Sequence, residues 1–149
     1  MKKLTVLILL AFFSINLKAQ TAEDSVKMTI NFFFEGMKRG DTTLLKSTMT
    51  EGVIFQTIAR TKEGNAIKTE NVKEFLEFIA KPKQDIPDER ITFETIKIDG
   101  ALASVWTPYK FYMGEKFSHC GANSFQLVRL NRIWKIQYII DTRRKQGCE

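Results

Sequence analysis

The stretch from Ala101 to Arg144 constrains the fold more than any other part of the chain. It contains three runs rich in β-branched and aromatic residues, separated by Met113-Gly114-Glu115 and by Asn131-Arg132. Such runs with turn residues between them are typical of consecutive antiparallel strands. The stretch also holds both tryptophans, all three tyrosines, the only histidine and one of the two cysteines. We therefore expect a three-stranded meander that carries most of the chemically distinctive side chains.

The register of the last two strands follows if Asn131-Arg132 is a two-residue turn. Leu130 then pairs with Ile133, and Phe125 pairs with Tyr138. Successive side chains point to opposite faces, so one apolar face is expected to cover the core, unless a bulge at Gly121 shifts the phase. That face holds His119, Gly121, Asn123, Phe125, Leu127, Trp134, Ile136, Tyr138 and Ile140. The opposite face holds Ser118, Cys120, Ala122, Gln126, Lys135, Gln137, Ile139 and Asp141.

Upstream of the meander the sequence predicts three helices and two strands. Apolar residues at spacings of three and four mark the helices, and Asp41 and Asn71 are suited to cap two of them. The expected helices run from Thr21 to Arg39, from Thr42 to about Met49, and from about Val72 to Lys81. The expected strands are Val53 to Ala59 and Arg90 to Ile98, with a polar loop from Arg60 to Thr69. This order predicts an α+β domain with helices packed on one face of a curved antiparallel sheet.

The first 19 residues are typical of a cleavable signal peptide. Met1 is followed by two lysines, the apolar run from Leu4 to Leu17 is short for a membrane span, and Leu17-Lys18-Ala19 resembles a signal-peptidase site. We expect cleavage after Ala19, which leaves residues 20–149 as one domain that is secreted or periplasmic and not bound to the membrane. An uncleaved membrane anchor is the alternative. The absence of a cysteine after the apolar run argues against a lipoprotein.

Charge argues against a nucleic-acid partner. The formal net charge of +6 falls to +3 on processing, because the signal segment contains three lysines and no acidic residue. Cations cluster only at Arg143-Arg144-Lys145, and a short charged run of this kind is usually a solvated chain end.

The two cysteines of an exported chain predict a disulfide between Cys120 and Cys148. In the register above, Cys120 stands opposite Arg143, five residues before Cys148, so the bond would pin the C-terminal tail to the sheet. Two unpaired thiols are the alternative.

Several short motifs resemble those of the nuclear transport factor 2-like superfamily. They are Phe33-Phe34-Glu35-Gly36 leading to Gly40-Asp41 and Leu44, then Ala101-x-Ala103, then Phe125-x-Leu127 followed by Trp134-Lys135-Ile136. Within the superfamily the chain looks most like the small SnoaL-like and lumazine-binding-like bacterial domains. The resemblance covers nearly all of the mature chain in element order. It implies a cone-shaped half-barrel in which three helices close a curved sheet around a pocket, often as a homodimer formed through the outer face of the sheet.

Members of this superfamily include isomerases, cyclases, dehydratases and non-enzymatic binding domains, so the fold does not by itself select a function. In the enzymes an Asp or Glu, or a His–Asp pair, usually works in the pocket. This chain does not present that set at matching positions, which favours binding over catalysis.

His119 is the candidate with the most versatile chemistry, because a histidine beside an apolar cavity can exchange a proton near neutral pH. The alternative is a packed histidine whose nitrogens bond to Asn123 or to a tyrosine hydroxyl. Tyr109 and Tyr138 offer hydroxyl groups to a ligand, although aromatic residues at strand spacing often serve only the core.

Two neighbouring groups are less suited to chemistry with His119. Asp141 is expected to face away from it and to pair with Arg143 or Arg144. Cys120 adjoins His119 in the same strand and so points to the opposite face.

One histidine and two cysteines without a spaced cluster fall short of the usual metal-ligand sets. The sequence also lacks a glycine-rich phosphate loop and a GxSxG nucleophile motif. We therefore expect no metal and no cofactor.

These observations predict an exported domain that binds a small apolar or aromatic molecule inside the cone. The expected ligand-binding residues are Tyr109, His119, Asn123 and Tyr138. One alternative is an isomerase- or dehydratase-type enzyme with His119 as general base. Another is a structural or interaction module that dimerises through an outer sheet face including Trp106 and Tyr112. A filled cone without a ligand is the remaining possibility.

Overall fold

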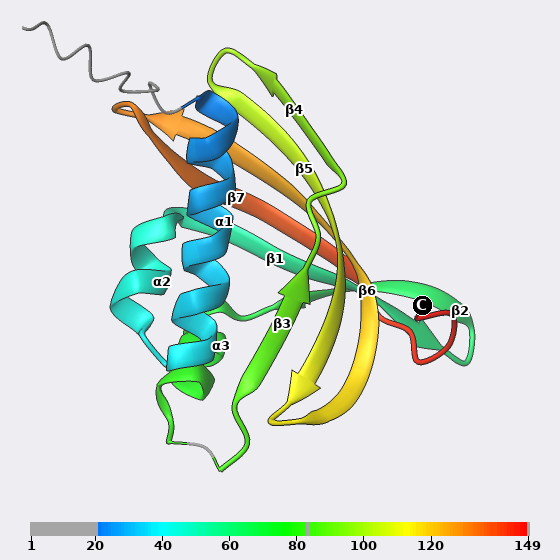
Figure 1. Ribbon diagram of the computed structural model, residues 1–149. Helices are drawn as coiled ribbons and strands as arrows, with labels where there is room; N and C mark the ends of the chain where they lie inside the picture. The colour runs from blue at the N-terminus through cyan, green and yellow to red at the C-terminus, as the bar shows by residue number, and fades with distance from the viewer. Residues whose placement is uncertain (1–20, 83, 149) are drawn as a thin grey trace, which may run out of the picture.

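The structure is a computed structural model that describes residues 21–82 and 84–148, so the predicted signal peptide lies outside the described residues. Within them the chain forms three helices and seven strands. In chain order these are α1 (Ala22–Arg39), α2 (Thr42–Thr48), β1 (Met49–Thr61), β2 (Gly64–Glu70), α3 (Val72–Ala80), β3 (Pro87–Ile91), β4 (Thr95–Asp99), β5 (Leu102–Met113), β6 (Lys116–Leu130) and β7 (Ile133–Thr142). Figure 1 shows a strongly curved sheet with the helices gathered on one side of it.

The strands form one sheet in the order β2-β1-β7-β6-β5-β3, and β4 also pairs with β5. Neighbouring strands are antiparallel except β1 and β7, which run parallel. The predicted α+β class, with three helices on a curved open sheet, is confirmed. None of the helices in the described part of the chain is long and apolar enough to cross a membrane.

The helices begin and end where local chemistry predicts. Thr21 and Asp24 form a capping box at the start of α1, and Gly40 ends that helix with a left-handed φ of 71°. Asp41 accepts a hydrogen bond from a backbone N–H in the first turn of α2. Asn71 accepts two such bonds at the start of α3. These local signals were sufficient to place all three helices from sequence.

The core lies between α1 and the concave face of the sheet. Ile30 and Val26 of α1 are fully buried, and Trp134 of β7 is only 3 % exposed. The Thr29 hydroxyl lies 3.4 Å from the Trp134 carbonyl oxygen, which places this side of β7 against the helix. The prediction that the Trp134 side of the last hairpin faces the helices is confirmed.

Two sequence predictions about the strands were wrong. The segment predicted as a polar loop contains β2, an exposed edge strand paired with β1. Polar side chains on both of its faces gave no alternating pattern to detect. The strand predicted over residues 90–98 is divided into β3 and β4, because three residues (92–94) lie opposite Thr107 and Pro108 of β5. Proline has no N–H to donate, so the regular ladder is interrupted at this point, although the Thr92 N–H still donates to the Pro108 carbonyl oxygen at 2.9 Å.

The register of β6 and β7 starts as predicted and then shifts by one residue. Leu127 pairs with Ile136, but Gln126 pairs with Tyr138 and Asn123 with Asp141. The additional residue is Gln137 of β7, so the bulge is not at Gly121. The predicted faces were therefore wrong beyond this point: Ile139 and Asp141 lie on the core side, and Tyr138 and Ile140 do not.

The Gln137 side chain accounts for the bulge. Its Oε1 accepts a hydrogen bond from the Thr50 hydroxyl at 3.0 Å, and its Nε2 donates to the Gly52 carbonyl at 3.1 Å. Both partners lie where the pairing of β1 with β7 is interrupted, between Met49 and Ile54. One amide side chain thus bonds both to a backbone carbonyl and to a side-chain hydroxyl of β1 where the regular pairing is interrupted.

The predicted disulfide between Cys120 and Cys148 is present, with a Cα–Cα distance of 5.7 Å. Because of the bulge, Cys120 pairs with Arg144 and not with Arg143. Two backbone hydrogen bonds of 2.9 and 2.8 Å join Cys120 and Arg144. The bond spans a sequence separation of 28 residues, which corresponds to a stabilisation of about 3–4 kcal/mol. It fixes the chain immediately after β7 to the sheet.

Candidate functional site

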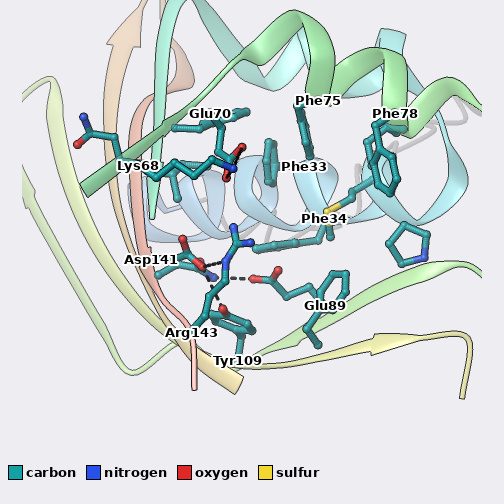
Figure 2. A pocket seen from close by; sticks show the side chains of 18 of the residues that line it. Phe33, Phe34, Lys68, Glu70, Phe75, Phe78, Glu89, Tyr109, Asp141 and Arg143 are labelled. Carbon is teal, nitrogen blue, oxygen red and sulfur yellow. Dashed lines mark hydrogen bonds and ion pairs between the residues drawn. The ribbon is translucent and has the colours of Figure 1, made fainter. Parts of the chain in front are cut away.

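A cavity of about 570 Å³ lies between the helices and the sheet. This volume is in the range of pockets that hold small organic ligands. Side chains from α1, α3, β1, β2, β3 and β5 to β7 form its walls. Phenylalanines thus fill part of the cone but leave a cavity in it (Figure 2).

Phenylalanine side chains dominate the apolar wall. They are Phe33, Phe34, Phe55, Phe75, Phe78, Phe111 and Phe125. Phe33 is central: its ring centroid lies 5.8 Å from that of Phe55 in an edge-to-face pair and 6.3 Å from that of Phe75 in a stacked pair. Aromatic pairs in these geometries stabilise one another beyond simple area burial, so the wall is held in place before any ligand arrives.

The opposite end of the cavity is polar and centres on Asp141, which the bulge in β7 turns toward it. The Tyr109 hydroxyl lies 3.0 Å from Asp141 Oδ2 and 2.9 Å from the Thr142 carbonyl oxygen. Burial, together with the negative charges of Asp141 and Glu89, raises the pKa of Tyr109. The phenol therefore stays protonated at neutral pH and acts as a donor.

Arg143 is the second group of this polar end. Its Nε donates to Asp141 Oδ2 at 2.9 Å. Burial alone would lower the pKa of Arg143, but the hydrogen bond and charge of Asp141 outweigh it and raise the pKa. Figure 2 shows the guanidinium, which belongs to the residue just after β7, extending into the cavity between Asp141 and the aromatic wall.

Glu89 of β3 completes the polar end, and sequence reasoning did not identify it. Its Oε1 accepts a hydrogen bond from Asn123 Nδ2 at 2.7 Å, and the same nitrogen lies 3.3 Å from Thr107 Oγ1. Burial raises the pKa of Glu89 to about 7; the Asn123 hydrogen bond opposes the shift, and the nearby charge of Asp141 adds to it. Glu89 is thus present in both protonation states near neutral pH.

His119 lines the cavity as predicted but has a different partner. Its Nδ1 lies 3.0 Å from the Ser118 hydroxyl, not beside Asn123 or a tyrosine hydroxyl. The ring stacks on Phe111 with a centroid distance of 4.9 Å. Burial, and then the positive charge of Arg143, lowers the pKa of His119 below its ordinary value. The imidazole is therefore mainly neutral at pH 7.

The structure brings three of the four predicted ligand-binding residues together. Tyr109, His119 and Asn123 all line the cavity, whereas Tyr138 lies outside it and donates to Gln56 Oε1 at 2.7 Å. Trp106 is 42 % exposed, as expected for an outward-facing residue of β5. Among the described residues, no group of three or more His, Cys, Asp or Glu side chains is placed to hold a metal ion.

Gly121 permits the close packing that positions Tyr109. A Cβ atom at this position would lie 1.7 Å from the Thr142 carbonyl oxygen and 2.7 Å from Tyr109 Cε1. Real Cβ atoms do not approach other atoms so closely, so only glycine lets the end of β7 and the Tyr109 ring meet over β6. Glycine is required at this position because there is no space for a Cβ atom, and not because of its backbone conformation.

We predict that Gly121→Ala destabilises the protein by about 1–3 kcal/mol, because the added methyl group overpacks this contact. Urea unfolding measures the change. Gly52→Ala is the matched control, since a Cβ at Gly52 would have no neighbour within 4 Å, and it should change stability by no more than about 0.5 kcal/mol. Equal effects of the two substitutions would contradict the assigned role of Gly121.

Comparison with known proteins identifies the fold. No protein-family model matches the chain, and no curated protein matches it. A nuclear transport factor 2-like protein of unknown function from Shewanella baltica OS155 aligns with a TM-score of 0.65 and 14% identity, covering 83% of this chain and 94% of that one. Another from Shewanella oneidensis MR-1 aligns with a TM-score of 0.64 and 15% identity, covering 82% and 99%.

A third solved structure comes from Streptomyces avermitilis and belongs to the same family, where it is described provisionally as a dehydratase. It aligns with a TM-score of 0.63 and 15% identity, covering 81% of this chain and 94% of that one. Sequence identities this low indicate a shared fold only. With its three helices, its curved seven-stranded sheet and these structural neighbours, the protein has the fold of the nuclear transport factor 2-like superfamily.

Proposed function

We propose that the protein binds a small, largely apolar molecule in the cavity between the helices and the sheet. The observation that carries this proposal is the division of the cavity into a phenylalanine wall and one polar end. Apolar pockets with a few convergent polar groups are the usual form of a small-molecule site. The wall supplies affinity through burial, and the polar end orients the ligand.

The energetics favour such a ligand. Burying about 100 Å² of its apolar surface against the phenylalanines would contribute about 2.5 kcal/mol. At the polar end, Tyr109 and Arg143 are already held by hydrogen bonds to Asp141. Glu89 is held by a hydrogen bond from Asn123. Little side-chain freedom therefore remains to be lost on binding, which limits the entropic cost.

The proposed setting is outside the cytoplasm. The signal-like first 19 residues support export, and the disulfide between Cys120 and Cys148 is of a kind that persists in oxidising compartments. A homodimer formed through the outer sheet face, where Trp106 is exposed, is part of the same proposal.

We predict that the apolar dye Nile red binds in the cavity and that Phe78→Ser weakens binding by roughly tenfold, because part of the apolar wall is lost. Phe78 is 51 % exposed at the cavity edge, so its replacement should leave the fold intact. Dye fluorescence measures the affinity.

Phe32→Ser is the matched control for this experiment. Phe32 is also a partly exposed helical phenylalanine, at 44 %, but it does not line the cavity. Absence of dye binding to the wild type, or equal losses in the two variants, would contradict the proposal.

A second candidate function is proton transfer, and the specific observation that favours it is Glu89. A carboxylate in an apolar cavity with a pKa of about 7 is suited to act as a general base near neutral pH. The Tyr109 hydroxyl and the Arg143 guanidinium lie at the same end and are able to stabilise negative charge on a substrate oxygen. These roles correspond to an isomerase or dehydratase in which Glu89, and not His119, is the general base.

If Glu89 is a base, hydrogen–deuterium exchange next to the carbonyl of cyclic ketones should be catalysed, and its rate should rise as pH increases through about 7. The rate rises because only the ionised form of Glu89 accepts a proton. NMR measures the exchange, and Glu89→Gln should abolish it. Activity that survives in Glu89→Gln and is lost in His119→Ala would assign the base to His119, and no exchange with any ketone would contradict the enzymatic candidate.

A further inference from the structure

The charges around the polar end of the cavity are largely paired with one another. Arg143 pairs with Asp141 at 2.9 Å, and Lys68 pairs with Glu70 at 3.3 Å. The titratable and charged groups that face this end are Asp141 on β7, Arg143 just after it, Glu89 on β3, Tyr109 on β5, His119 on β6, Lys68 and Glu70 on β2, and Glu74 on α3. Glu89 has an amide partner in Asn123 but no cation at hydrogen-bonding distance among the described residues.

The guanidinium of Arg143 has binding capacity left over. Among the hydrogen bonds of the described residues, only its Nε has a partner, Asp141. Figure 2 shows its two terminal nitrogens directed into the cavity, toward the space bordered by Phe34 and Glu70. The side chain remains 51 % exposed, so a ligand is able to reach these nitrogens. Two parallel N–H groups of a guanidinium match the two oxygens of a carboxylate.

We propose that the natural ligand is a carboxylic acid with an apolar body, whose carboxylate is bound by the terminal nitrogens of Arg143 while its body lies along the phenylalanine wall. This inference rests on the proposed binding function and specifies the class of ligand. It also explains why the polar end contains a cation whose Nε is held by Asp141. That hydrogen bond fixes the plane of the guanidinium, so its two free nitrogens are presented together.

The ionisation of Glu89 determines how the affinity for such a ligand depends on pH. When Glu89 is protonated, the Arg143–Asp141 pair and Glu89 together carry no net charge, and Glu89 does not repel an incoming carboxylate. When Glu89 is ionised, it repels the carboxylate. Since the pKa of Glu89 is raised to about 7, binding should weaken as pH rises through that value, and a bound carboxylate should raise the pKa further. A cationic ligand would show the opposite trend.

The test compares three head groups on one body. Phenylalkanoates of increasing chain length, with the matching alcohols and amines, are titrated into the wild-type protein by calorimetry at pH about 6 and about 8, on either side of the Glu89 pKa. We expect the carboxylate to bind roughly 10- to 100-fold more tightly than the alcohol at the lower pH, as charge-assisted hydrogen bonds predict. Its affinity should fall at the higher pH.

Variants assign the effect to residues. Arg143→Gln should remove the preference for the carboxylate, and Arg143→Lys should restore only part of it, because an ammonium cannot pair with Asp141 and hold two ligand oxygens in the same geometry. In Glu89→Gln the carboxylate affinity, whatever its absolute value, should no longer change between pH about 6 and 8, which separates Glu89 from His119. Arg60→Gln, which removes an exposed arginine of β1 outside the cavity, should match the wild type.

The outcomes separate this inference from the proposed function. If alcohols or amines bind as tightly as the carboxylates, or if carboxylate affinity is unchanged in Arg143→Gln, the inference is overturned while the binding function stands. Carboxylate binding that strengthens as pH rises would also overturn it. If no compound of any head group binds and Nile red does not bind either, the binding function itself fails.

Discussion

The amide side chain of Gln137 links the last strand to the irregular start of β1, and the geometry of the cavity depends on this link. It accepts a hydrogen bond from Thr50 and donates one to the carbonyl of Gly52. The extra residue it accommodates changes the phase of β7. Before it, Trp134 and Ile136 face the helices; after it, Ile139 and Asp141 face the cavity. An uninterrupted strand would instead have turned Tyr138 and Ile140 inward and left the polar end without the Asp141 carboxylate.

The phase change has a chemical consequence because it places a charge beside an apolar wall. Asp141 in this position attracts Arg143, accepts a hydrogen bond from Tyr109 and raises the pKa of Glu89 beyond the effect of burial. Each of these effects is stronger for a buried carboxylate such as Asp141 than it would be for one on the surface. The disulfide contributes by fixing the segment that follows Arg143. Gly121 contributes by leaving room for the Tyr109 ring to reach Asp141 and Thr142. Binding and proton transfer are both functions that such an arrangement can support.

Sequence reasoning succeeded where the signals are local. Capping residues such as Asp41 and Asn71 define helix starts within a few positions. On β5 and β6, Tyr109, His119 and Asn123 share a face through simple alternation, so their convergence on one cavity was predictable. The pairing of Cys120 with Cys148 followed from compartment and proximity, and an error of one residue in the register did not affect it.

It failed where the deciding contact joins distant parts of the chain. The run Tyr138-Ile139-Ile140 is apolar on both faces, so its pattern is compatible with either phase. The choice is made by Thr50 and Gly52, more than 80 residues earlier in the sequence. Glu89 lies in a five-residue strand with charged side chains on both faces. Nothing in that segment shows that one of those charges enters a cavity, because its environment is formed by β5, β6 and β7.

The most direct test of this account is the ionisation of Glu89, followed by carbon-13 NMR of the labelled carboxyl group and assigned with Glu89→Gln. We expect a pKa of about 7 for Glu89, and Asp141→Asn should lower this pKa, because the cavity-facing charge of Asp141 disfavours the ionised form of Glu89. A pKa near 4.5, the ordinary value for a glutamate, that does not respond to Asp141→Asn would mean that Asp141 points away from the cavity. The phase change at Gln137, and the site built on it, would then be wrong.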